Sequence, residues 1–184
     1  MKTQLLPCNV PWVISPSSSG VTLFHSESDE QPDCTVVFGG GRLQESGKID
    51  LRRIELIFEV CRFARAAPKP DNAELESCGF DLSRLPNFGD DVSLQGFKSA
   101  WLRDGYCPES GFYVASESRW LSTLPDYYRS RCYHFVVCGR DGYVELIAQG
   151  YTWREWRWEN GHREESIRGP VIGLGDFRGG TAPS

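Results

Sequence analysis

The sequence predicts an α+β protein: a mainly antiparallel, curled β-sheet or half-open barrel with two or three short helices packed on it. Residues 51–64 alternate between apolar and charged side chains, which is the period of a long half-buried strand. Two apolar runs, 133–138 and 143–148, flank a glycine-containing turn. Because successive strands are joined by short connections, antiparallel pairing is favoured.

Size and composition limit the possible functions. A chain of 184 residues with 40% hydrophobic residues can bury a core, and we expect one domain. The net charge of -5 argues against a general binder of nucleic acid or anionic membranes, and is compatible with a basic protein partner. The seven cysteines include no Cys-x-x-Cys pair, so we expect free thiols in a reducing cytoplasm, with no metal and no cofactor.

The first half of the chain is expected to contain three strands. We expect residues 1–20 to be an irregular lead-in held by Trp12, followed by strands at 21–25 and 34–38, the second of which ends at Gly39-Gly40-Gly41. In the long strand 51–64, the inward positions are the apolar even ones. These are Ile54, Leu56, Phe58 and Val60.

Helical signals are few and short. Residues 72–78 and 93–103 have helical spacing, and Ser118 is expected to cap a single turn that runs to Leu124. A further strand is expected at 111–116. Near the C-terminus we expect a last short strand at 171–174 and a loose tail at 178–184.

The hairpin at 133–148 carries the most detailed expectation. If Arg140-Asp141-Gly142 is a three-residue loop with Gly142 left-handed, Gly139 faces Tyr143. The same register gives one dry face, on which three cross-strand pairs lie. These pairs are Cys138 with Val144, Val136 with Leu146, and His134 with Ala148.

Beyond Gly150 this parity would place Arg154 on the core side. An unpaired buried arginine is costly, so either Gly150 is a bulge that reverses the faces or the strand leaves the core. Half of the six tryptophans follow within six residues, together with two arginines. Because tryptophan and arginine are enriched at binding hot spots, this strand is the candidate partner-binding site. Its residues are Tyr151, Trp153, Arg154, Trp156, Arg157 and Trp158. The alternative interpretation is that the tryptophans seal one end of the sheet core.

Other constellations give weaker signals. Cys132, His134 and Cys138 share a strand face but span too great a length to hold one metal, so His134 is expected to be a buried, hydrogen-bonded residue. An alternative pocket would bring together charged residues from several strands for acid–base chemistry or ligand binding. Its residues are Glu55, Glu59, Glu145 and Arg154.

The sequence therefore predicts a non-catalytic cytoplasmic binding protein. One candidate within that class is an immunity-like or antitoxin-like protein that masks a basic protein partner. The alternative is a small β-barrel-like enzyme or small-molecule carrier with a pocket lined by carboxylates and arginine. Single-stranded nucleic-acid binding through tryptophan stacking is a third hypothesis, and the negative net charge counts against it.

Overall fold

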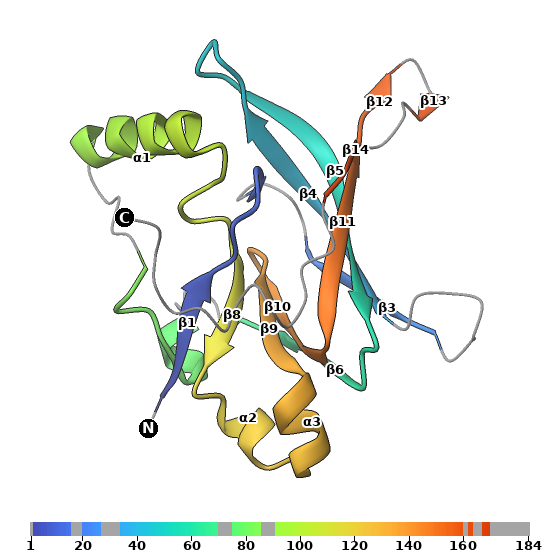
Figure 1. The fold of residues 1–184 in the computed structure, drawn as a ribbon. Coiled ribbons are helices and arrows are strands. Elements are labelled where there is room, and N and C mark those ends of the chain that lie inside the picture. Colours follow the sequence, from blue (N-terminus) through green and yellow to red (C-terminus); the bar gives the residue numbers. More distant parts are fainter. Residues whose placement is uncertain are drawn as a thin grey trace.

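The computed structural model describes residues 2–15, 20–26, 34–69, 75–85, 91–159, 162–163 and 167–169. Within these ranges the strands form two larger sheets and one small ribbon (Figure 1). Sheet A has the order β6 (Phe63–Pro68), β10 (Gly142–Ala148), β9 (Tyr133–Cys138), β8 (Phe112–Ser116), β1 (Thr3–Pro7), β7 (Phe80–Asp81). Sheet B has the order β14 (Ile167–Arg168), β11 (Gly150–Trp156), β5 (Ile49–Glu59), β4 (Cys34–Leu43), β2 (Val13–Ile14), and β3 (Thr22–His25) also pairs with β4. The ribbon is formed by β12 (Trp158–Glu159) and β13 (His162–Arg163).

The two sheets are joined at a corner where two neighbouring strands bend together. β5 continues into β6 through Val60, which has a φ of 48°, and β10 continues into β11 through Gln149. Across the bend the Gln149 N–H donates to the Glu59 carbonyl over 3.0 Å, and the Arg62 N–H donates to the Ile147 carbonyl over 2.9 Å. Because β6 pairs with β10 and β5 pairs with β11, the bend folds one continuous antiparallel surface over on itself. The predicted curled α+β architecture is confirmed.

The main core lies between the two sheets. Phe58 of sheet B meets Phe112 and Phe135 of sheet A, and the Phe112 ring lies edge-on to Tyr151 with 4.7 Å between ring centroids. Trp12 is completely buried in the same cluster, as its expected anchoring role requires. A second, smaller cluster covers the opposite face of sheet A and includes Leu5 and Val136.

The hairpin exists as predicted, but the predicted register differs from the observed one by one residue. Tyr143 pairs with Cys138, and Gly139 donates its N–H to the carbonyl of Gly142, so the loop is the two-residue turn Arg140-Asp141. Gly142 has no positive φ, and the three-residue loop that we expected does not form. Since side chains alternate along a strand, the one-residue shift turns the residues of β9 that were expected to face the core to the opposite face. The core-facing residues are in fact Phe135, Val137, Val144, Leu146 and Ala148.

Two expectations for the N-terminal half are also wrong. Thr3–Pro7 is not irregular, because it forms β1 between β7 and β8. Strand β4 does not stop at the glycines but continues through them to Leu43. A β-carbon on Gly40 would lie 2.6 Å from the Ile54 side chain and 3.0 Å from the Val13 carbonyl. The glycine there allows β2 and β5 to approach β4 closely.

Three of the four described helical segments lie where their sequence signals predicted them. The four segments are the 3-10 turn η1 (Leu75–Cys78), α1 (Asp91–Asp104), α2 (Arg119–Ser122) and α3 (Asp126–Arg131). Ser118 caps α2 by accepting the Leu121 N–H, as predicted. Sequence analysis did not predict α3, although Asp126 in its first turn and Arg129 and Arg131 in its last turn complement the helix dipole. The expected strand at 171–174 and tail at 178–184 lie outside the described residues. No described helix is long and apolar enough to span a bilayer.

Replacement of two glycines by alanine should have opposite effects. Gly40→Ala should lower the free energy of unfolding by ~1–3 kcal/mol, because its methyl group meets Ile54 and a backbone carbonyl. Gly96→Ala in α1, where nothing lies within 4 Å of the added carbon, should raise it by ~0.5–1 kcal/mol. Urea unfolding of both variants measures this, and equal shifts would contradict the close packing at Gly40.

Candidate functional site

The candidate recognition strand is divided between core and surface. Strand β11 pairs with β5, and the corner before it reverses the faces, so that Tyr151 and Trp153 point inward. Tyr151 is fully buried and Trp153 is 5% exposed. These two residues therefore cannot form part of a partner-binding surface, and for them the alternative interpretation, sealing of the core, holds. For Trp158 the structure describes the backbone only, so the prediction for its side chain is not tested.

The other face of β11 points away from the core. Arg154 pairs in register with Glu55 and forms an ion pair with it. Trp156 pairs in register with Arg53 and is half-buried. On β5 the next outward residue is Leu51, which is 67% exposed. The outward half of the predicted strand thus lies on a mixed face of aromatic, aliphatic and guanidinium groups.

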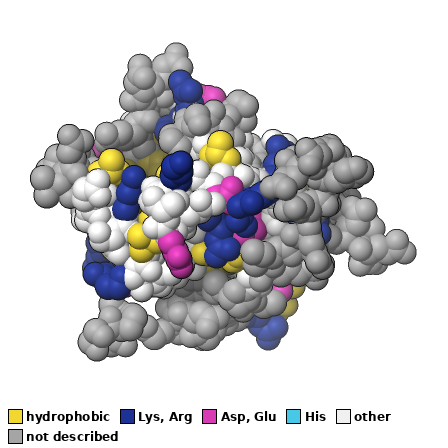
Figure 2. Space-filling view, turned by 90° about the horizontal axis from the view of Figure 1, so that it is seen from above, with side chains coloured by type: hydrophobic (Ala, Val, Ile, Leu, Met, Phe, Trp, Pro, Cys, Tyr) yellow, Lys and Arg dark blue, Asp and Glu magenta, His cyan; other side chains and the backbone are white. Residues whose placement is uncertain are grey.

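A charged network lies on the inward face of sheet B, beyond the end of the apolar core. Glu155 follows Trp153 on that face, and its side chain is 0% exposed. One of its carboxylate oxygens accepts hydrogen bonds from Arg42 over 2.9 Å and from Arg52 over 2.6 Å. Arg52 and Arg157 both pair with Asp50. Figure 2 shows basic and acidic side chains side by side at this end of the molecule.

Arginines pair with both carboxylates of this network and leave an excess of one positive charge. Three guanidinium groups surround two carboxylates, and a carboxylate as deeply buried as Glu155 requires such partners. Arg157, predicted as a partner-binding residue, contributes here by linking the end of β11 to β5. The arrangement stabilises the open end of the sheet.

The four residues of the alternative pocket do not come together. Glu55 and Arg154 pair on the outer face of sheet B, and Glu59 is exposed at the end of β5. Glu145 lies on sheet A, where Arg65 contacts both of its oxygens, over 2.8 and 2.9 Å. A pocket formed by these four residues is therefore a wrong prediction, because Glu145 lies on the outer face of sheet A whereas Glu55 and Arg154 lie on the outer face of sheet B.

Glu145 belongs instead to a buried polar chain. The Nε2 of His134 lies 3.0 Å from a Glu145 oxygen, and its Nδ1 lies 2.7 Å from the Ser118 hydroxyl. The Trp120 ring packs edge-on against His134, and the Arg65 guanidinium stacks over Trp120 at 4.3 Å. His134 is buried and hydrogen-bonded as expected, although its neighbours differ from those that the expected register gave it.

Serine, histidine and a carboxylate in this order resemble the residue types of a nucleophilic triad. Here, however, all three side chains are buried, and the Ser118 oxygen also accepts the Leu121 N–H at the start of α2. The two ring nitrogens of His134 contact Ser118 on one side and Glu145 on the other. The chain therefore fixes α2 to sheet A and leaves no exposed nucleophile.

The ionisation of Glu145 is controlled by this chain. Burial alone would raise the pKa of the Glu145 carboxyl, but hydrogen bonds from His134 and Arg65 outweigh it and hold the pKa below its ordinary value. A carboxyl whose pKa is lowered by folding stabilises the protein above its unfolded pKa, and this stabilisation is lost as pH falls.

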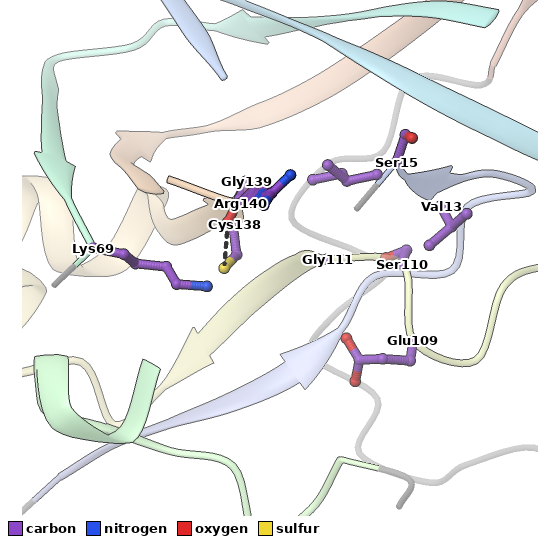
Figure 3. A pocket seen from close by; sticks show the side chains of 10 residues that line it. Val13, Ser15, Lys69, Glu109, Ser110, Gly111, Cys138, Gly139 and Arg140 are labelled. Atoms are coloured by element: carbon purple, nitrogen blue, oxygen red, sulfur yellow. Dashed lines mark hydrogen bonds between the residues drawn. The ribbon is translucent and has the colours of Figure 1, made fainter. Parts of the chain in front are cut away.

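A cavity of about 350 Å³ opens where four segments that are remote in the sequence meet (Figure 3). It is lined by β2, Lys69 after β6, the segment before β8, and the turn between β9 and β10. The lining residues are Val13, Ile14, Ser15, Lys69, Glu109, Ser110, Gly111, Cys138, Gly139 and Arg140. Sequence analysis missed this site, because no local motif connects residues that only the fold brings together.

Glu109 is the unusual group in this cavity. One of its oxygens accepts the Tyr113 hydroxyl over 2.5 Å, and the other is buried with no hydrogen-bond partner among the described residues. Burial raises the pKa of the Glu109 carboxyl, and the hydrogen bonds from the Tyr113 hydroxyl and the Gly111 backbone offset this only in part. Burial likewise raises the pKa of the Cys138 thiol to about 11, so this sulfur is a neutral group at pH 7.

Comparison of the chain with models of known protein families, with curated proteins and with solved structures finds no match. The function must therefore be inferred from the geometry of these sites.

Two tryptophans of β11 should differ sharply in their contribution to stability. Trp153→Ala removes a ring that contacts Trp12 in the core, so we expect a loss of ~3–5 kcal/mol in the free energy of unfolding. Trp156→Ala on the outer face should cost ~1 kcal/mol or less. Chemical denaturation of the two variants checks the difference, and similar losses would contradict the reversal of faces at the corner.

The stability that Glu145 provides should depend on pH. We expect Glu145→Gln to be less stable than the wild type at pH 7, because the variant loses the charged contacts to Arg65. The difference should shrink as pH falls below the ordinary glutamate pKa of about 4.3, because the unfolded carboxyl then binds a proton, and it should be lost once the pH is below the lowered pKa of the folded carboxyl. Urea unfolding at a series of pH values from neutral to acid measures it. A constant difference over that series would contradict the lowered pKa.

Proposed function

We propose that this chain is a non-catalytic binding protein that recognises a protein partner through the outer face of sheet B. The observation that carries the proposal is the grouping of aliphatic, aromatic and guanidinium side chains on the outer face of β5 and β11. We call this group the outer patch; it consists of Ile49, Leu51, Arg53, Arg154 and Trp156.

The exposure of the outer patch is the first support. Ile49 is 47% exposed and Leu51 is 67% exposed, and their spacing of two residues along β5 directs both to the same side. Trp156 lies across from Arg53 in the adjacent strand. Apolar side chains that cluster on a surface are a mark of interaction sites, and tryptophan and arginine dominate binding energy at many interfaces.

The outer patch carries little net charge. Arg154 is neutralised by its ion pair with Glu55, so Arg53 is the remaining cation beside the apolar side chains, and the apolar groups are the main basis for binding a partner. The expectation of a basic partner rests on the net charge of -5 of the whole chain. The outer patch gives that expectation no further support. An immunity-like or antitoxin-like role is a narrower proposal within the same class.

Two further observations favour a binding role in the cytoplasm. The residue types of a catalytic triad, Ser118, His134 and Glu145, are buried and hydrogen-bonded to one another, so they support the structure and not a reaction with an external substrate. All seven cysteines are thiols, which favours a reducing compartment.

Leu51→Asp should weaken partner binding by about tenfold or more, because it places a charge at the apolar centre of the outer patch. The partner is first isolated as a stoichiometric complex with the tagged full chain, and its affinity for wild type and variants is then measured by calorimetry. Leu102→Asp, at another exposed leucine on α1, is the matched control and should bind like the wild type. The absence of a stoichiometric partner, or equal weakening by both substitutions, would overturn the proposal.

A further inference from the structure

The cavity at Glu109 is separate from the outer patch. None of its lining residues belongs to the outer patch, and most of them come from sheet A and the segments next to it. An inference about its ligand therefore does not depend on the proposed protein partner.

The walls of the cavity are held in place by backbone hydrogen bonds. Ile14 donates its N–H to Ser110 over 2.9 Å, and Cys138 donates its N–H to Gly111 over 2.8 Å. The Lys69 N–H bonds the Asp141 carbonyl over 3.0 Å. Since these bonds join the separate segments, the cavity exists before any ligand binds.

Opposite charges line the cavity without neutralising one another. Lys69 and Glu109 form no salt bridge with each other, and within the described ranges Lys69 has no acidic partner. Figure 3 shows the Lys69 ammonium and the Glu109 carboxyl both directed inward, from opposite sides of the site. Arg140 at the rim is a second cation; it is 65% exposed and lies 3.9 Å from the similarly exposed Asp141 carboxylate.

Glu109 is the acidic group of the cavity, and no described cation forms an ion pair with it. A carboxylate that lines a cavity without a cationic partner is costly to keep ionised. An ammonium group of a ligand in the cavity would offset this cost and favour the charged form of the carboxyl. A ligand carboxylate at the other side would in turn pair with Lys69.

We propose that this cavity binds a small zwitterion of the amino-acid type, with its ammonium group at Glu109 and its carboxylate at Lys69 and Arg140. The volume of about 350 Å³ is at the lower end of the ~300–1,000 Å³ typical of small-molecule sites, and this restricts the ligand to a small molecule. Val13 and Ile14 supply an apolar wall for a short side chain. Cys138 is a neutral thiol that adds to the wall, so the site binds its ligand without covalent chemistry.

Ligand probes that differ by one charged group test this proposal. The full-length chain labelled with 15N is titrated with each standard amino acid, and the amide signals of Gly111 and Gly139 report on the cavity walls. We expect saturable shifts with at least one amino acid. For L-valine, the matched analogues are 3-methylbutanoate, which lacks the ammonium group, and 2-methylpropylamine, which lacks the carboxylate. The corresponding analogues of any amino acid that binds should bind about tenfold or more weakly, because each lacks one charged contact.

Substitutions assign each charge to its role. Glu109→Gln keeps an oxygen that can accept the Tyr113 hydroxyl but removes the charge, and should weaken amino-acid binding by about tenfold. It should leave the affinity for the carboxylate-only analogue unchanged. Lys69→Gln should weaken binding of the carboxylate-only analogue as well. The matched controls Glu76→Gln and Lys48→Gln, at exposed positions outside the cavity, should bind like the wild type.

Three results would overturn the proposal. The first is no saturable shift at the cavity amides with any standard amino acid at millimolar concentration. The second is equal affinity for an amino acid and its single-charge analogues. The third is unchanged binding in Lys69→Gln, a variant of a partly exposed side chain whose fold is checked independently by circular dichroism. None of these results depends on the outer patch, so the two proposals fail or stand separately.

Discussion

The corner between sheets A and B is the feature on which the rest of the structure depends. At this point β5 turns into β6 and β10 turns into β11, and backbone hydrogen bonds from Gln149 and Arg62 keep the two bends aligned. The paired strands therefore fold over as a unit. This brings Phe58 and Tyr151 of one sheet against Phe112 and Phe135 of the other, and the burial of these rings supplies the hydrophobic energy of the core.

The same bend decides which charged groups are buried and which remain available. Glu155 and Glu145 both end up deep in the molecule, and each is neutralised by arginines from neighbouring strands. Glu109 is different, because its carboxyl lines a cavity and no described arginine or lysine forms an ion pair with it. Buried carboxylates neutralised by arginines stabilise a fold, whereas a carboxyl that lines a cavity without a cationic partner has capacity for a ligand. This difference is why the cavity, and not the larger charged network, carries the inference about a ligand.

The outer patch and the cavity present two different kinds of surface. The outer patch combines exposed aliphatic groups with Trp156 and Arg53 on a sheet face, an arrangement that suits a macromolecular partner. The cavity is concave, small and lined by opposite charges, which suits a small dipolar molecule. Because the two sites use different strands, their functions can be separated by substitution.

The sequence by itself determined the elements whose signals are local and strong, but not β1 or α3. Alternation at Ile54, Leu56 and Phe58 gave the inward face of β5, and the cap at Ser118 gave the start of α2, because these signals lie within a few neighbouring residues. The hairpin register depended on whether the turn has two or three residues, and glycines at both ends of Arg140-Asp141 allow either. Only the tertiary structure decided it. The reversal of faces after the corner, and the placement of Lys69 and Glu109 in one cavity lined by four remote segments, were likewise settled by packing between strands, which no local pattern encodes.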